Sequence, residues 1–552
     1  MKHSKLALLI SAAIFTSAGA YASDNNVVDV VQNGASNTAN VTQQVGSDNN
    51  DATIDQDGTS NVATVKQSDT SNTHAFVTQK GEGNEGTITQ HNATQTATAI
   101  IDTRGNENDA TIEQEFNNGD EAEATITQRG GSNEAVISQY NGDGSDSAIN
   151  QFGSGDKAEI DNIWSDYATA IITQEAGPGN NALITQSDSD AAEAYLSQNG
   201  AGNSGEIYQK TDENGSAPGV DDTVATLTQT GNDNTGYVEQ TALSNLADVY
   251  QNGNDNQADV YQTGEYNEAD VDQQGDNDTA YVSQSGQDGY ASVSQSGNTL
   301  NTGLVYQSGF SNSATIAQVG SDHMSTITQS EYDNVANVDQ TNVDNNATVT
   351  QSGSASGMGN LATVMQDGLG DSALVEQIGS DNTAIVEQGT DSHDNDVFIY
   401  QTGNENYAGA STELGGDSTV TINQEGNNNY VGNLPGTNNY YGPNVGAGTY
   451  GAENVITIDQ IGNENKAYAD SSDFSSEVDI DQTGDLNTAI AESWLGTDND
   501  IMISQTGTLH NADVFVNGAG NNMVSITQTD ASNTANVTSI GNGNSVTVVQ
   551  GM

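Results

Sequence analysis

The sequence contains no cysteine, only four prolines, and few aromatic residues, which make up 5% of the chain. Basic residues are also scarce, because nine Lys and Arg stand against 76 Asp and Glu, a net charge of −67. The absence of cysteine excludes disulfide bridges. The scarcity of basic residues argues against binding to nucleic acid or to an anionic membrane surface. Low hydrophobicity with high net charge is typical of disorder, but disordered chains are usually richer in proline.

The N-terminal segment, 1–22, predicts a secretory signal peptide. Lys2 and Lys5 form a charged start, residues 6–16 are apolar, and Ala20-Tyr21-Ala22 offers small residues for cleavage. The apolar stretch is too short to span a bilayer, and no later segment is apolar enough to do so. We therefore expect a secreted chain that starts at Ser23, lies outside the cell or on its surface, and does not insert into a membrane.

Glutamine recurs with a period of about 11 residues, which is typical of a repeat architecture. The clearest series keeps this period at every step except one, from Gln295 to Gln307, which is longer by a single position. Towards the C-terminus the spacing doubles, as between Gln460 and Gln482, with Ser471 at the midpoint. This divergence indicates that the full repeat is a pair of half-repeats, about 22 residues in all. The series is Gln229, Gln240, Gln251, Gln262, Gln273, Gln284, Gln295, Gln307, Gln318, Gln329, Gln340 and Gln351.

Each half-repeat reads as a short strand followed by a turn. Alternation in period two directs Ala258, Val260 and Gln262 to one face, and Asp259 and Tyr261 to the other. The strand is followed by the pattern x-Gly-x-x-Asn-x, in which we expect the glycine to supply unusual backbone angles and an asparagine such as Asn256 to tolerate them. The predicted turn glycines are Gly34, Gly253, Gly264, Gly275 and Gly484.

Such short strands must stack to bury anything. The sequence therefore predicts an all-β, amyloid-like, two-sheet β-solenoid of strand-turn-strand coils, about 22 residues each. At about 4.8 Å per coil, about 24 coils would form a rod of roughly 115 Å. Recurring inward amides can bond to the coils above and below as a ladder. The predicted inward set is the twelve glutamines of the clearest series together with Asn256, Ala258, Val260 and Asn267.

We divide the chain into a signal peptide at 1–22, a solenoid at 23–431, an irregular Gly/Asn/Pro/Tyr-rich insertion at 432–446 and a second solenoid part at 447–552. Both solenoid parts carry the same repeat. The insertion is set apart because two of the four prolines, Pro435 and Pro443, lie in it.

The repeated frame resembles the curlins, the subunits of bacterial curli fibres. It reads Gln-x-Gly-x-x-Asn-x-Ala-x-x-x-Gln at 251–262, and the same frame starts at Gln32 and at Gln262; at Gln482 it recurs with Ser493 in place of the closing glutamine. The resemblance covers most of 27–550. It implies an extracellular functional amyloid of the biofilm matrix that self-associates into adhesive, pilus-like fibres. It also implies export through an outer-membrane curli-type pore and nucleation by a second subunit.

The sequence shows no catalytic motif, so we do not expect an enzyme. No two of the mature chain's histidines (His74, His91, His323, His393 and His510) have metal-ligand spacing, and we interpret all five as surface residues of turns or strands. No cofactor is expected. Acidic turns such as 46–51 predict at most weak, nonspecific binding of divalent cations.

Two alternative functions stay open beside the fibre. One is a monomeric acidic solenoid adhesin that binds a surface or calcium. The other, more remote, is an ice-binding solenoid, suggested by outward Thr-x-Thr pairs such as Thr326 and Thr328.

Overall fold

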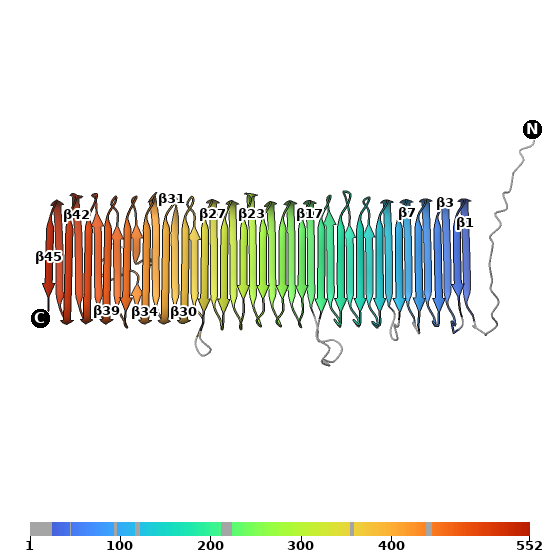
Figure 1. Cartoon of the computed structure of the whole chain (residues 1–552), viewed down its shortest axis with the longest axis horizontal. Helices are drawn as coiled ribbons and strands as arrows, with labels where there is room; N and C mark the ends of the chain where they lie inside the picture. Colours follow the sequence, from blue (N-terminus) through green and yellow to red (C-terminus); the bar gives the residue numbers. More distant parts are fainter. Residues whose placement is uncertain are drawn as a thin grey trace, which may run out of the picture.

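The computed structural model describes residues 25–44, 46–92, 96–115, 122–210, 223–353, 358–437 and 444–551. These residues form 45 β-strands and no helix; accordingly, no helix in this part of the chain could cross a membrane. The predicted signal peptide lies outside the described residues. Figure 1 shows the strands side by side along a straight rod, from β1 at one end to β45 at the other.

The strands form two sheets, and the chain alternates between them. The first sheet contains β1 (Val27–Ala35), β3 (Asp51–Thr59), β5 (His74–Glu82), β7 (Thr98–Asn106), β9 (Glu123–Gly131), β11 (Asp146–Gln151), β13 (Thr169–Gln174), β15 (Glu193–Asn199), β17 (Val224–Asn232), β19 (Leu246–Asn254), β21 (Glu268–Asp276), β23 (Tyr290–Thr299), β25 (Ser313–Ser321), β27 (Val335–Val343), β29 (Leu361–Gln366), β31 (Thr383–His393), β33 (Tyr407–Gly416), β35 (Tyr430–Val431), β36 (Ala447–Thr449), β38 (Lys466–Ser471), β40 (Thr488–Trp494), β42 (Asn511–Gly520) and β44 (Thr534–Asn542).

The second sheet contains β2 (Thr38–Gln43), β4 (Val62–Ser68), β6 (Glu85–His91), β8 (Asp109–Glu115), β10 (Glu134–Tyr140), β12 (Lys157–Ile163), β14 (Asn181–Ser187), β16 (Ser204–Lys210), β18 (Thr235–Gln240), β20 (Gln257–Gln262), β22 (Thr279–Gln284), β24 (Thr302–Gln307), β26 (Met324–Ser330), β28 (Asn346–Ser352), β30 (Ser372–Ser380), β32 (Asp396–Asn404), β34 (Thr419–Asn427), β37 (Val455–Ile461), β39 (Glu477–Asp485), β41 (Asp500–Thr508), β43 (Met523–Ala531) and β45 (Ser545–Gln550).

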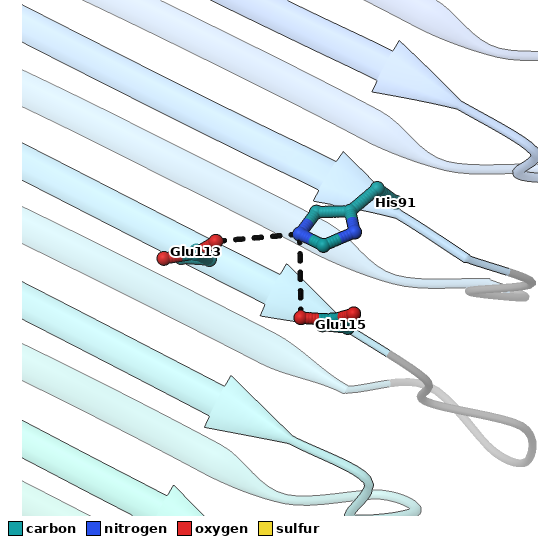
Figure 2. A group of neighbouring side chains, drawn as sticks. All are labelled: His91, Glu113 and Glu115. Carbon is teal, nitrogen blue, oxygen red and sulfur yellow. Dashed lines mark hydrogen bonds and ion pairs between the residues drawn. The ribbon is translucent and has the colours of Figure 1, made fainter.

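All pairings are parallel and place equivalent residues of successive coils beside each other. In the first sheet Gln229 lies beside Gln251, which lies beside Gln273. In the second sheet the same register places His91, the last residue of β6, beside Glu115, the last residue of β8 (Figure 2). The structure is therefore the two-sheet β-solenoid predicted from the period of the glutamines.

The coils are fewer and slightly longer than expected. In the part of the chain that the structure describes, each sheet has 22 layers, because β35 and β36 share one layer of the first sheet. This gives 21 steps rather than about 23. Typical steps are 22–25 residues, as between Gln229 and Gln251 or between Gln114 and Gln139. Three insertions lengthen single coils to 31, 26 and 36 residues.

The core is a narrow continuous column between the two sheets. Its inward positions repeat in the order Ala, β-branched or Leu, Gln, as in Ala258, Val260 and Gln262, which are all fully buried. The alternate residues Asp259 and Tyr261 point outward and are half-buried. Because parallel stacking places identical side chains one above another, each methyl group packs on its counterparts in the neighbouring coils.

The turn glycine is required by close approach of the next coil. Gly253 has φ +148°, and a Cβ atom there would lie 1.8 Å from the carbonyl oxygen of Gly275. Gly34 and Gly484 have similar left-handed φ values of +111° and +117°. Gly264 and Gly275 do not adopt a positive φ, although a Cβ atom on Gly264 would also overlap the next coil's backbone.

The expectation for Asn256 was wrong in one respect. The positive φ, +57°, belongs to the preceding residue, Asp255. Asn256 itself is buried, because the left-handed residue before it turns its side chain into the stack. The asparagine is therefore selected for its inward amide rather than for backbone tolerance.

The segment between β35 and β36 covers part of the outer face of the first sheet. Leu434 and Val445 are buried, and the Tyr407 hydroxyl donates to the carbonyl oxygen of Asn444 at 2.8 Å. The outward side of β33 is accordingly buried as well. Residues 438–443 of this predicted insertion lie outside the described residues.

Candidate functional site: the amide ladders and the ends of the stack

The predicted inward residues line the interior of the solenoid. None of the sixteen is more than 4% exposed. Gln240 donates from Nε2 to Oε1 of Gln262 at 2.8 Å, and Gln262 donates in the same way to Gln284 at 2.9 Å. The Nε2 of Gln262 also donates to the backbone oxygen of Leu246 in the opposite sheet at 2.9 Å. Each amide therefore joins consecutive coils and both sheets.

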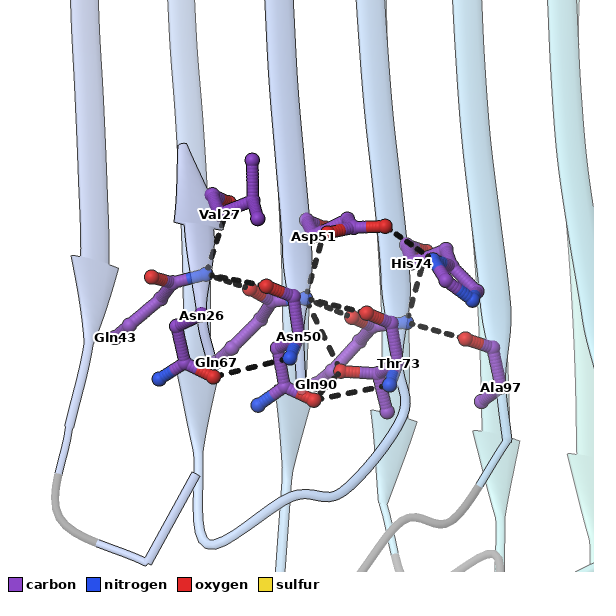
Figure 3. A network of polar contacts seen from close by, with 10 residues as sticks. All are labelled: Asn26, Val27, Gln43, Asn50, Asp51, Gln67, Thr73, His74, Gln90 and Ala97. Atoms are coloured by element: carbon purple, nitrogen blue, oxygen red, sulfur yellow. Dashed lines mark hydrogen bonds and ion pairs between the residues drawn. The ribbon is translucent and has the colours of Figure 1, made fainter. Parts of the chain in front are cut away.

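Figure 3 shows the same ladder near the N-terminal end, where Gln43, Gln67 and Gln90 follow one another. Nε2 donates throughout towards the C-terminal neighbour. A buried amide without a partner costs about 1–3 kcal/mol, so this repeated pairing is what permits a polar column inside the buried core.

A second ladder of asparagines runs in the opposite direction. The backbone N–H of Asn256 donates to Oδ1 of Asn234, one coil earlier, at 3.1 Å. The Asn256 Nδ2 donates to the carbonyl oxygen of Gly275 at 2.8 Å. The Oδ1 atoms thus accept from the C-terminal side, whereas the glutamine Oε1 atoms accept from the N-terminal side. The two opposed ladders give the stack a polarity.

Two histidines belong to the asparagine ladder, which corrects the prediction that all five are surface residues. His323 and His510 are each 1% exposed. In each imidazole Nδ1 accepts from the next coil's backbone N–H at 3.3 Å, as an asparagine Oδ1 would. Burial lowers the pKa of His323. Their spacing from the neighbouring asparagines, 22 or 23 residues, was the available signal.

Aspartates replace asparagine at three further ladder positions: Asp156, Asp278 and Asp371. Asp278 Oδ1 accepts from the backbone N–H and from Nδ2 of Asn301, both at 3.0 Å, but its Oδ2 is buried without a partner. Burial raises the pKa of all three carboxyl groups.

The glutamine ladder is interrupted at particular coils. Thr103 replaces glutamine in the first sheet, and the Oε1 of the following Gln128 has no partner. In the second sheet Asn162 replaces glutamine, and the Oε1 of the following Gln186 has no partner. After Gln388 the first sheet carries no further glutamine at this position; its residues are Thr412, Thr449, Ser471, Ser493, Val516 and Ser539.

Both ends of the stack expose inward-facing residues. At the N-terminal end, Val28 and Val30 of β1 are 49% and 38% exposed, although their counterparts in the next coil are buried. β45 is likewise half-exposed along its length. β1 pairs only with β3, and β45 only with β43, among the described strands. Each end therefore presents a free strand edge and an uncovered core.

The hydrogen-bonding groups at the two ends are complementary. Within the described residues, nothing donates to Oε1 of Gln43, whereas the Gln550 Nε2 donates only to the backbone oxygen of Thr534, at 2.9 Å. The Oδ1 of Asn544 likewise accepts nothing at the C-terminal end. One end thus offers an acceptor where the other offers a donor.

The outer faces are acidic, with a limited aromatic stripe. Burial, together with neighbouring carboxylates such as Asp481, raises the pKa of Asp479 to about 6. Four tyrosines on the second sheet, Tyr237, Tyr261, Tyr281 and Tyr306, have ring centroids 5.3–5.4 Å apart. Such aromatic pairs add modestly to the packing between coils.

A comparison with known protein families supports the interpretation of the repeat. The model described as "Curlin associated repeat" matches at eleven positions, some of them overlapping, which together cover more than half of the chain. The matched residues are 47–81, 119–153, 221–253, 244–273, 253–284, 264–297, 301–330, 357–389, 393–426, 475–507 and 496–529. A search of curated proteins returned no significant match.

Proposed function

This chain belongs to the curlin associated repeat family, and from that premise we propose that it is a non-enzymatic structural protein that assembles end to end into amyloid-like fibres at the cell surface. In this proposal the fibres serve adhesion and the biofilm matrix. The proposal is supported most directly by the two open ends, which expose matching edges and complementary ladder groups.

Stacking the N-terminal end of one copy on the C-terminal end of another would continue both ladders. The free N–H of Gln550 would donate to Oε1 of Gln43, and the backbone N–H of Asn37 would donate to Oδ1 of Asn544. Val41 and Val548 would pack as counterparts in the second sheet, both being half-buried at present. Unpaired edges of this kind favour strand addition.

The contact is head-to-tail, because the surfaces that meet are different. Heterologous contacts that do not close into a ring produce open filaments. Since every coil is nearly parallel to the next (Figure 1), one added copy would present a new end of the same kind. Growth could then continue without a change in the shape of the subunit.

We also propose export through a pore and nucleation by a second subunit, as the family resemblance implies. A chain without cysteine can be threaded unfolded through an outer-membrane pore, and a nucleating subunit would supply the first edge. We therefore infer that the protein lies outside the cell after removal of residues 1–22.

The test compares fibre formation by the mature chain with that of an end-blocked variant. Val41→Asp places a charge on the inward side of β2, where it would be buried in the joint. Thr42→Asp is the matched control, because it adds the same charge one residue away on the exposed outer side. Electron microscopy, dye binding and fibre diffraction would follow assembly, with a reflection of about 4.7–4.8 Å expected from fibres.

We expect fibres from the wild type and from Thr42→Asp, and single folded rods from Val41→Asp. Isolated rods from the wild type at all concentrations would refute self-assembly and favour the monomeric adhesin. Equal fibre growth by both variants would show that the joint does not involve β2.

A further inference from the structure

The outer face of the second sheet carries one cluster that the repeat does not explain. His91 ends β6, and Glu113 and Glu115 lie near the end of β8 in the next coil (Figure 2). Glu113 and Glu115 are two residues apart on one strand, so both side chains leave the same face. The separation of His91 from Glu115 along the sequence matches one coil, which is why the sequence alone did not bring them together.

The two carboxylates converge on the Nε2 atom of His91. Nε2 of His91 lies 3.3 Å from Oε1 of Glu113 and 3.5 Å from Oε2 of Glu115. All three atoms lie within 4.8 Å of one another. Asn92 donates from Nδ2 to Oε1 of Glu115 at 2.8 Å, which leaves Oε2 of that carboxylate facing the imidazole.

We propose that His91, Glu113 and Glu115 bind a divalent transition-metal ion of the Zn²⁺ class. Zinc bonds of about 2.0–2.2 Å in a tetrahedron separate ligand atoms by roughly 3.3–3.6 Å. The two distances from the imidazole nitrogen already have this length. The two carboxylate oxygens lie within 4.8 Å of each other, and the Glu113 side chain, which is 54% exposed, has room to rotate so that they adopt this separation.

The ligand set selects the class of ion. One imidazole and two carboxylates suit Zn²⁺ and its neighbours in the transition series, whereas Ca²⁺ takes six to eight oxygen ligands. Three protein ligands leave a position for water. The strongly acidic chain, with a net charge of −67, would further favour the binding of a cation.

An ion bound here would join two consecutive coils from outside. β6 and β8 are neighbours in the second sheet, so the ion would hold their ends together and neutralise the two carboxylates of β8. This role does not depend on the assembly of fibres, and the site can be tested on single molecules.

The test is calorimetric titration of the mature chain with Zn²⁺ at about 0.15 M salt, where surface charge is screened. Excess Ca²⁺ would occupy nonspecific carboxylate sites. We expect about one equivalent of Zn²⁺ to bind in a distinct class that Ca²⁺ does not displace. His91→Ala should weaken this class at least tenfold, as should the double variant Glu113→Gln, Glu115→Gln.

Two matched variants serve as controls because each removes a surface histidine that has one carboxylate beside it. His74 lies 3.1 Å from Asp51, and His393 lies 3.7 Å from Asp394. Neither His74→Ala nor His393→Ala should change the distinct class. Co²⁺ absorption provides a second readout, because ligand-field bands in the wild type should vanish in His91→Ala.

The proposal is overturned if His91→Ala binds Zn²⁺ with unchanged affinity and stoichiometry, or if Ca²⁺ displaces the ion completely. Circular dichroism of each variant would establish that the fold is intact. The proposal would also be contradicted if Co²⁺ bound to the wild type gave no ligand-field bands of a site with a nitrogen ligand.

Discussion

Replacing one ladder glutamine tests whether inward amides stabilise the stack. In Gln262→Leu, Oε1 of Gln284 loses its donor and one N–H of Gln240 loses its acceptor, while Gln240 keeps its bond to the oxygen of Val224. Two orphaned groups at about 1–3 kcal/mol each give about 2–6 kcal/mol. The larger apolar surface of leucine offsets about 1–2 kcal/mol of this. We expect a net loss of about 1–4 kcal/mol.

The loss should be local, because repeat arrays do not always unfold as one cooperative unit. Native-state hydrogen exchange followed on peptides from 235–295 is therefore the appropriate assay. Since about 1.4 kcal/mol corresponds to a factor of ten, backbone amides of β20 and β22 should exchange about five-fold to several hundred-fold faster. Coils near β41 should be unchanged.

Two further variants distinguish the loss of the amide hydrogen bonds from a change in side-chain packing. Ser283→Ala lies on the outward side of the neighbouring strand β22 and should change stability by no more than about 0.5 kcal/mol. Gln262→Glu keeps the shape but places an acceptor against Oε1 of Gln284. At neutral pH this variant should destabilise the stack more than Gln262→Leu does. In acid its stability should recover, because a protonated carboxyl group can donate to Oε1 of Gln284. Equal exchange in wild type and Gln262→Leu would refute the ladder as a source of stability.

Four other predictions address the breaks, the turns and the charge. Thr103→Gln should stabilise the chain by about 1–3 kcal/mol, because it supplies a donor to the orphaned Oε1 of Gln128; an unchanged denaturant midpoint would contradict this. Gly253→Ala should cost at least about 3 kcal/mol from overlap with the next coil, whereas Gly179→Ala, also at positive φ but with open space around it, should cost about 1 kcal/mol. Burial raises the pKa of Asp278 in the folded state. The contribution of this carboxyl group to the free energy of unfolding is therefore largest below the unfolded pKa of about 3.9 and is lost as the pH rises through the folded pKa. Denaturation at pH 4 and at pH 7.5 should show greater stability in acid, and Asp278→Asn should reduce the difference. The mature charge, 7 − 76 = −69, should make fibre growth slow in low salt and faster with salt, acid or divalent cations, and dye-binding kinetics insensitive to ionic strength would refute this.

The repeat made most of the fold predictable. The period of the glutamines, the alternation at Ala258–Gln262 and the turn pattern were sufficient for two parallel sheets, because every coil imposes the same constraint on its neighbours. The sequence also indicated that polar residues would lie inside, since an amide that recurs at each coil can always find a partner. Irregular coils were harder to predict, because an insertion breaks the sequence period but leaves the register of the neighbouring strands unchanged.

The features that the sequence did not predict depend on contacts between coils, and these contacts cannot be read from a single half-repeat. The buried roles of His323 and His510 become visible only when each histidine is aligned with the asparagines one coil away. The meeting of His91 with Glu115 needs the longer coil step found in that part of the chain. The opposed directions of the two ladders could not be derived from residue types, because a glutamine can donate in either direction.

The unequal ladders of the two sheets determine where a fibre of this protein would be weakest. In the second sheet glutamine continues to Gln550, so the joint between two copies would include an amide bond to Gln43. In the first sheet Ser539 occupies the equivalent position, and the incoming Gln32 would meet a shorter hydroxyl side chain instead of an amide. Within the chain, by contrast, most steps between β13 and β31 have glutamine in both sheets. The joint would therefore have one amide column, as the coils after Gln388 also do, where the central coils have two. Unlike those coils, the joint has no covalent connection between its two sides, so a fibre under shear should break between copies rather than within them.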